Sequence, residues 1–180
     1  MNAEEIKEST IYVLGAGTVN EALANIAAVV DFPVKLIDYD EEKLDQSRFP
    51  NAELICFDFN KLMEDPQAGK NAGIDPQEND YICVITRGHT YDNQGVTWAL
   101  GTNAHYIGMM GSAKHIRKVR EFATEQGISN ELLDTVHMPI GIDINAKDAN
   151  EIGLSVVAEI VADYEERLNR EKDHDSLHKE

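Results

Sequence analysis

Short apolar runs alternate along the chain with stretches in which apolar residues recur every three to four positions. The runs predict strands over residues 11–14, 34–37, 53–57, 81–85, 105–109 and, as a shorter segment, 136–137. The periodic stretches predict helices over 18–30, 113–126 and 149–164, with a short further helix at 61–64. Strands that alternate with helices are typical of α/β proteins with a parallel sheet. We therefore predict a single doubly wound, mostly parallel, three-layer αβα domain of the Rossmann type over residues 1–164, followed by a charged tail, helical or disordered, over residues 165–180.

A glycine turn follows the first predicted strand and opens a helix. It consists of Gly15, Ala16, Gly17 and Thr18. The turn matches the first two glycines of the G-x-G-x-x-G dinucleotide fingerprint, in which backbone N–H groups approach a phosphate. Asn20 stands at the third position, where it could crowd a pyrophosphate, and Asp38 follows the next strand at the distance expected for an acid that binds a ribose hydroxyl. The pattern indicates a nucleotide-like ligand, with Asp38 as a simple turn cap the structural alternative.

Small and polar residues also follow three later strands. They are Thr86, Arg87, Gly88, His89 and Asp92 after the fourth strand, Gly111 and Ser112 after the fifth, and His137, Gly141 and Asp143 after the last. Because the carboxyl ends of parallel strands share one edge of the sheet, these segments are predicted to converge on the glycine turn and form a binding crevice. Arg87 is suited to an anionic group or to a neighbouring carboxylate. Ser112 is best explained as a helix N-cap, because no nucleophile elbow surrounds it.

The composition narrows the choice of partners. Lys and Arg total 16 against 33 Asp and Glu, a formal net charge of −17. Such a surface repels phosphate backbones and anionic lipid, so we expect no nucleic acid and no membrane partner. The acidic N-terminus lacks a signal-like pattern and no run reaches membrane-spanning length, which favours a cytoplasmic location. Cys56 and Cys83 lie in apolar runs and are predicted to be inert, buried thiols.

The sequence offers little support for a metal site. A grouping of His89, His137 and Asp143 is conceivable, but no local ligand spacing supports it, and no metal is expected. No role is assigned to the remaining histidines, which are His105, His115, His174 and His178. Only His89 or His137 could serve as a proton-transfer group, and each has a structural explanation that is about as good.

Three segments together resemble the Rossmann-type C-terminal domain of the XdhC/CoxI family, the accessory proteins of xanthine dehydrogenase and related molybdenum hydroxylases. They are residues 84–92, 106–112 and 137–144, and residues 151–159 also fit. The resemblance implies a maturation factor that binds molybdenum cofactor (molybdopterin), protects it during sulfuration and helps to insert it into the apo-hydroxylase. It also implies a homodimer. Family members usually carry another N-terminal domain, so we expect any chemistry of that domain to come from a separate protein or to be missing.

The chain departs from the family pattern at several positions. Thr18 replaces a usual histidine, Asn20 a glycine or alanine, and Asn145 a glycine, while Tyr39 and Asp40 follow Asp38 in place of an acid and an arginine. Two other interpretations stay open. The first is an NAD(P)-dependent oxidoreductase, supported by Asp38 but lacking a Tyr-x-x-x-Lys pair and room for a substrate domain. The second is a non-catalytic nucleotide-binding or scaffold domain. Whether the chain catalyses any reaction is left open.

Overall fold

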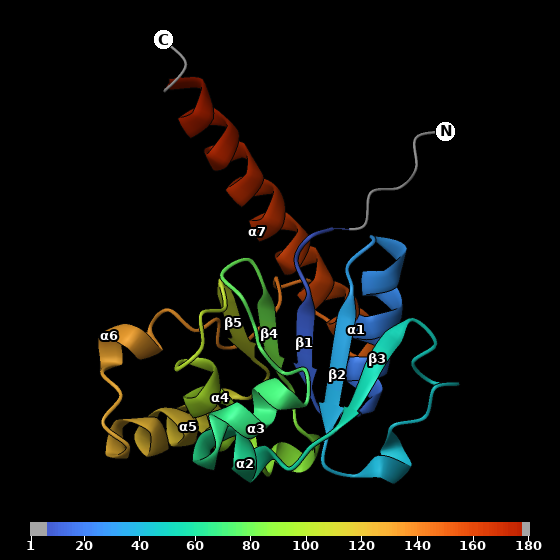
Figure 1. Cartoon of the computed structure of the whole chain (residues 1–180), viewed down its shortest axis with the longest axis vertical. Coiled ribbons are helices and arrows are strands. Elements are labelled where there is room, and N and C mark those ends of the chain that lie inside the picture. The colour runs from blue at the N-terminus through green and yellow to red at the C-terminus, as the bar shows by residue number, and fades with distance from the viewer. Residues whose placement is uncertain (1–6, 178–180) are drawn as a thin grey trace.

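The computed structural model describes residues 7–177 and contains a five-stranded sheet in the order β3-β2-β1-β4-β5 (Figure 1). The strands are β1 (Ile11–Leu14), β2 (Val34–Asp38), β3 (Ala52–Cys56), β4 (Tyr81–Val84) and β5 (Tyr106–Met109). All four pairings are parallel. This confirms the doubly wound prediction. The predicted sixth strand is reduced to one parallel bridge between His137 and Gly108, because Pro139 soon follows and has no N–H group for a ladder.

Helices cover both faces of the sheet. One face is covered by α1 (Thr18–Val29) and α7 (Ala149–Leu177). The other is covered by α2 (Phe59–Glu64), α3 (Pro66–Asn71), α4 (Asp92–Ala99), α5 (Ala113–Glu125) and α6 (Asn130–Leu133). Two short 3₁₀ helices, η1 (Glu41–Lys43) and η2 (Arg87–His89), follow β2 and β4. Because all strands are parallel, their carboxyl ends and the starts of the helices that follow them lie along one edge of the sheet, as the sequence predicts.

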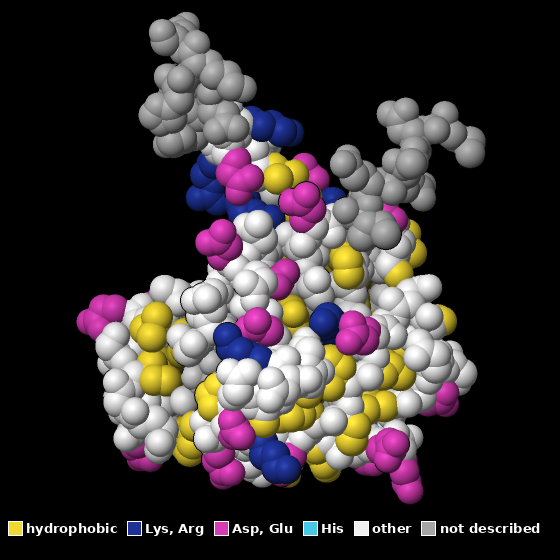
Figure 2. All heavy atoms as spheres, in the orientation of Figure 1, with side chains coloured by type: hydrophobic (Ala, Val, Ile, Leu, Met, Phe, Trp, Pro, Cys, Tyr) yellow, Lys and Arg dark blue, Asp and Glu magenta, His cyan; other side chains and the backbone are white. Residues whose placement is uncertain are grey.

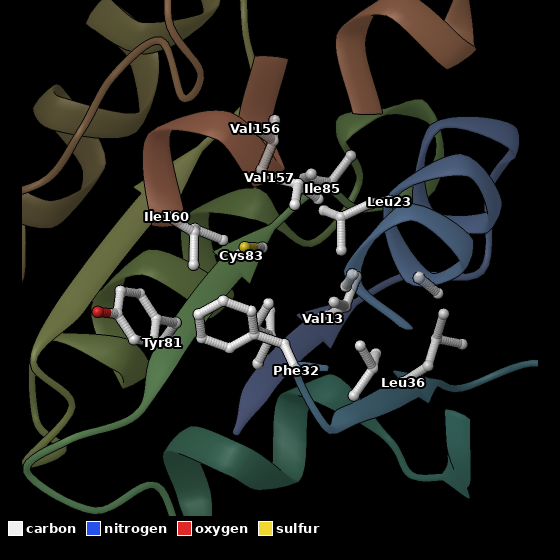
Figure 3. Packing of buried hydrophobic residues seen from close by; sticks show 14 of the residues in the cluster. Val13, Leu23, Phe32, Leu36, Tyr81, Cys83, Ile85, Val156, Val157 and Ile160 are labelled. Carbon is white, nitrogen blue, oxygen red and sulfur yellow. The ribbon is translucent and has the colours of Figure 1, made fainter. Parts of the chain in front are cut away.

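Alternating side chains of the central strands fill two cores. Val13 of β1 packs toward α1 and α7, whereas its neighbour Leu14 packs toward α4 and α5. Figure 3 shows Val156 and Ile160 of α7 in the first of these cores.

The prediction of two buried thiols is wrong for one of them. Cys83 is buried in β4, but Cys56 ends the edge strand β3 and is exposed, because the faces of this outer strand are covered less completely than those of the central β4.

The ends of the helices follow the expected capping chemistry. The Ser112 hydroxyl accepts a hydrogen bond from the backbone N–H of His115, so it caps α5 as predicted. The Asp148 carboxylate accepts one from the N–H of Glu151 at the start of α7. That helix continues through the charged sequence after Tyr164 to Leu177 and projects beyond the sheet (Figures 1 and 2), while residues 178–180 of the predicted tail lie outside the described residues. Of the helices in residues 7–177, none combines the length and apolar character that a membrane crossing needs.

Candidate functional site

A pocket lies at the carboxyl edge of the sheet, where the sequence predicts a crevice. It has a volume of about 490 Å³ and is open to solvent. Three separate segments line it. They contribute His89 after β4, Met110, Gly111 and Ser112 after β5, and residues 139–146, including Gly141, Asp143 and Ala146, before α7; Ile152 and Ser155 of α7 complete the lining. These are the same segments that carry the family resemblance, so the tertiary structure joins them in one site.

The turn before α7 is shaped by a glycine that no other residue can easily replace. Gly141 has a φ of +96°, and a Cβ added there would lie 2.5 Å from the Ser155 hydroxyl oxygen. Its N–H donates a hydrogen bond to the Glu159 carboxylate, which also contacts the ring of His137 at 2.6 Å from Nδ1. The His137 ring lies against the Tyr106 ring at a tilt of 35°, with 4.3 Å between the ring centroids. His137 therefore supports the pocket from the α7 side and is not part of its lining.

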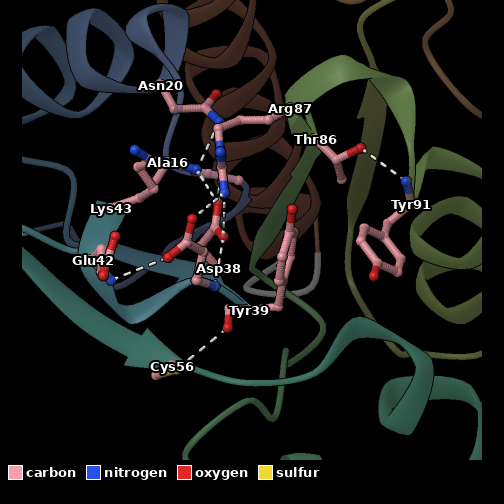
Figure 4. A network of polar contacts seen from close by, with 12 residues as sticks. Ala16, Asn20, Asp38, Tyr39, Glu42, Lys43, Cys56, Thr86, Arg87 and Tyr91 are labelled. Atoms are coloured by element: carbon pink, nitrogen blue, oxygen red, sulfur yellow. Dashed lines mark hydrogen bonds and ion pairs between the residues drawn. The ribbon is translucent and has the colours of Figure 1, made fainter.

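The glycine turn belongs to a separate ionic network on the same edge (Figure 4). Asp38 is fully buried, and its carboxylate accepts hydrogen bonds from the N–H groups of Ala16 at 2.7 Å and Asp40 at 2.9 Å. The Arg87 guanidinium approaches Asp38 at 3.4 Å and Asp40 at 3.0 Å. Its hydrogen bond to Asp38 is the main cause that raises the pKa of Arg87.

This network changes the interpretation of Asp38. Both of its oxygens are engaged by the chain itself, so a ribose hydroxyl would have to displace Arg87. The Arg87 side chain also covers the turn, since a Cβ added at Gly17 would lie 3.6 Å from Arg87 Cγ. Thr18 is exposed at the start of α1, and no side chain caps that helix. Asp38 thus acts here as the link between β2 and the glycine turn.

Asn20 lies beneath the turn and points into the protein. Its amide nitrogen donates hydrogen bonds to the carbonyl oxygens of Gly15 at 2.8 Å and Ile85 at 2.9 Å, and the residue is fully buried. Gly15 itself has a φ of +113°, and a Cβ there would lie 2.4 Å from the Ile85 oxygen. The expectation that Asn20 crowds a pyrophosphate is therefore wrong. Asn20 instead connects the end of β1 to the end of β4, where the dinucleotide fingerprint has its third small residue.

A second buried carboxylate lies beside the pocket. Asp92 is fully buried, and its Oδ1 accepts hydrogen bonds from both the N–H of Thr86 at 3.1 Å and its hydroxyl at 2.6 Å. Its Oδ2 contacts His89 Nδ1 at 2.7 Å and His115 Nε2 at 2.8 Å. Gly88 and His89 have φ angles of 63° and 58°, so a left-handed turn brings the His89 ring to this carboxylate.

Sequence reasoning missed His115. It stands in the first turn of α5, three residues after the capping Ser112, and helices that begin after a strand direct their first turn toward the carboxyl edge. That position was the available signal. The conceivable grouping of His89 with His137 and Asp143 does not form. Within residues 7–177, the group of three His, Cys, Asp or Glu side chains whose ligand atoms converge is His89, Asp92 and His115.

Comparison with known proteins identifies the family. The protein-family model described as the XdhC Rossmann domain matches residues 11–160 of the chain. The chain belongs to the XdhC family. This XdhC domain is 28% identical over 151 residues to a probable xanthine dehydrogenase subunit of Bacillus subtilis, and the match covers 84% of this chain and 42% of that protein. It is 24% identical over 153 residues to uncharacterized protein YqeB of Escherichia coli K12, covering 84% of this chain and 26% of that protein.

The fold of this XdhC domain also occurs in a solved structure. A crystal structure described as a xanthine dehydrogenase from Bacillus halodurans superposes with a TM-score of 0.69 at 23% identity. The match covers 85% of this chain and 41% of that one. At this identity the likeness establishes the fold. The XdhC domain described here spans less than half the length of each of these three relatives.

Proposed function

We propose that this XdhC domain is an accessory protein in the maturation of a xanthine dehydrogenase-type molybdenum hydroxylase, and that it binds molybdenum cofactor in the pocket at the carboxyl edge. One observation carries the proposal. The three sequence segments that resemble the family are the segments that line one pocket, through His89, Gly111, Ser112, Gly141 and Asp143. A family resemblance concentrated on a pocket lining favours a shared ligand over a shared scaffold alone. The name of the Bacillus subtilis relative supports the link to xanthine dehydrogenase.

The residues present fit a ligand of this kind. The pocket volume of about 490 Å³ lies within the range of about 300–1,000 Å³ that is usual for small-molecule sites. Ser112 and the first turn of α5 provide backbone N–H groups at a helix N-terminus, which suit a terminal phosphate. Bound there, molybdenum cofactor would supply the redox-active metal centre of the hydroxylase. The residues of this chain would hold the pterin and the phosphate.

Delivery to a partner enzyme requires protein contact near the pocket mouth. Ile142, Ile144 and Leu154 are large apolar side chains that are 41–49% exposed, and they lie on the pocket segment and the first turns of α7. Ile142 and Ile144 belong to the pocket lining, and Leu154 stands in sequence between the lining residues Ile152 and Ser155, so exposed apolar groups border the pocket and favour a protein interface. We infer that the apo-hydroxylase docks here. A separate protein carrying the additional N-terminal domain and a second copy of this chain stay predicted partners.

The contacts around the glycine turn argue against a dinucleotide site there and for ligand binding in the pocket. Because Arg87 covers the turn and Asp38 is engaged on both oxygens, binding of a dinucleotide would require the network to open. NAD and NADP should therefore be titrated by calorimetry in parallel with molybdenum cofactor released from a hydroxylase. Ala146→Trp places a large ring in the pocket lining, and Gly17→Val tests the turn. Ala28→Trp is the matched control, since Ala28 has similar partial exposure but lines a pocket at the opposite edge.

We expect the protein to bind molybdenum cofactor tightly. This binding should be lost in Ala146→Trp and kept in Ala28→Trp and Gly17→Val. Capture of the apo-hydroxylase should be weakened by Leu154→Glu while cofactor affinity stays unchanged, because Leu154 lies outside the pocket lining. Binding of NAD alone, lost in Gly17→Val, would replace the proposal with the oxidoreductase interpretation. Absence of both cofactor and hydroxylase binding at micromolar concentration would reject it and leave the scaffold interpretation.

A further inference from the structure

We propose that His89, Asp92 and His115 bind a divalent transition metal ion of the zinc class. Their three ligand atoms, one nitrogen from each ring and one carboxylate oxygen, all lie within 4.8 Å of one another. Bonds of about 2.0–2.1 Å in tetrahedral geometry place ligand atoms roughly 3.3 Å apart. The two contacts to Asp92 Oδ2, at 2.7 and 2.8 Å, would need to lengthen by about half an ångström to reach this spacing. Two imidazoles and one carboxylate favour zinc, iron, cobalt or nickel over magnesium or calcium.

The carboxylate is held in the orientation that a ligand requires. Thr86 donates both its N–H and its hydroxyl to Asp92 Oδ1, which leaves Oδ2 directed at the two rings. The Thr86 hydroxyl is itself positioned by a hydrogen bond from the N–H of Tyr91 at 3.2 Å. Hydrogen bonds of this kind behind a ligand are typical of metal sites, because they fix which oxygen faces the ion.

The charge balance of the cluster also favours a cation. Asp92 is fully buried, and a buried carboxylate needs a compensating positive charge. Within the described part of the chain, Asp92 forms ion pairs with His89 and His115 and with no lysine or arginine. Arg87, which is close in sequence, pairs with Asp38 and Asp40 instead. The His89 and His115 rings lie close together with their centroids 4.2 Å apart, and one divalent ion between them would neutralise the carboxylate and accept a lone pair from each ring.

The cluster reaches the pocket from its wall. His89 lines the pocket directly, with 41% of its side chain exposed. His115 packs against Gly111, another lining residue. A Cβ atom added to Gly111 would lie only 2.9 Å from His115 Cδ2. Three protein ligands leave a fourth coordination position open. We infer that this position takes water or an anionic oxygen of a molecule bound in the pocket.

Metal binding can be tested on the purified chain without hydroxylase or molybdenum cofactor, so this inference and the proposed function can fail separately. The protein is stripped with a chelator, titrated with Co²⁺ while its visible absorption is followed, and then competed with Zn²⁺. The variants are His115→Gln and Asp92→Asn. His105→Gln is the matched control, because His105 pairs with Asp163 at 2.8 Å at the opposite edge of the sheet. Circular dichroism of the stripped proteins shows whether each variant is folded.

We expect one equivalent of metal, a Co²⁺ spectrum of low coordination number, and a loss of affinity of about 100-fold or more in both ligand variants, with His105→Gln unchanged. Thr86→Val keeps all three ligands and should weaken binding by about 10–100-fold, as removal of a supporting hydrogen bond does. This variant keeps the test decisive if Asp92→Asn fails to fold. Equal affinity in wild type and His115→Gln would overturn the proposal, since the metal would then bind elsewhere. Binding of less than one equivalent would overturn it too.

Discussion

Replacement of Asn20 should reveal how much of the stability resides in the link beneath the glycine turn. Its amide donates to the carbonyl oxygens of Gly15 and Ile85, at 2.8 and 2.9 Å, across the ends of β1 and β4. In Asn20→Ala both carbonyls lose a donor inside the protein. In Asn20→Asp the donor becomes an acceptor that faces the same two carbonyls, and a charge is placed where the residue is fully buried.

The magnitudes follow from the number of groups affected. Two lost hydrogen bonds to buried carbonyls cost about 2–4 kcal/mol. Alanine returns roughly 1 kcal/mol through its higher helix propensity and because the unpaired Asn20 Oδ1 is removed. The expected loss in the free energy of unfolding is therefore about 2 kcal/mol for Asn20→Ala. Asn20→Asp should lose roughly 4 kcal/mol or more, since an unpaired buried carboxylate adds its own cost.

Urea unfolding followed by circular dichroism near pH 8 measures these differences. Asn25 provides the control, because it lies on the same helix, α1, but is exposed, so Asn25→Ala and Asn25→Asp should each change the free energy of unfolding by less than about 0.5 kcal/mol. The decisive quantity is the order of the two Asn20 variants. If Asn20→Asp is no less stable than Asn20→Ala, the amide is not acting as a donor to two carbonyls and the reasoning is refuted.

Three further predictions concern glycine, cysteine and tyrosine. Gly141→Ala should lower the free energy of unfolding, measured in urea, by about 2–3 kcal/mol, against about 1 kcal/mol for Gly127→Ala. Both glycines have a positive φ, but only at Gly141 would an added Cβ meet another atom, the Ser155 hydroxyl oxygen at 2.5 Å. Equal losses would show that the Ser155 contact relaxes freely. Of the two thiols, only Cys56 should react with a thiol reagent in the folded protein. Because partial desolvation and then Glu41 raise the pKa of Cys56, its reaction should need a more alkaline solution than that of a free thiol. Labelling of buried Cys83 before unfolding would contradict the fold. Burial raises the pKa of Tyr12 from 10.0 to about 12, so its contribution to stability is complete below pH 10 and is lost as the pH rises through 12; tyrosinate absorbance that rises without any loss of structure would show that the ring is accessible.

Local patterns determined most of the architecture. The apolar runs of β1 and β4 and the periodic stretches between strands require both faces of a parallel sheet to be covered, and a parallel sheet brings its strand ends to one edge. Ser112 as a cap of α5 follows from a short-range rule as well. These inferences succeed because each depends on neighbouring residues and on the geometry of regular elements.

Tertiary structure alone decided the chemistry at that edge. His115 meets Asp92 across 23 positions of sequence, and Arg87 meets Asp38 across 49, so both pairings depend on strand order, register and side-chain rotamers. The same holds for Cys56, whose exposure depends on the position of β3 at the sheet edge. A sequence pattern specifies which face of an element is buried, but it does not specify which polar groups meet once separate elements are packed together.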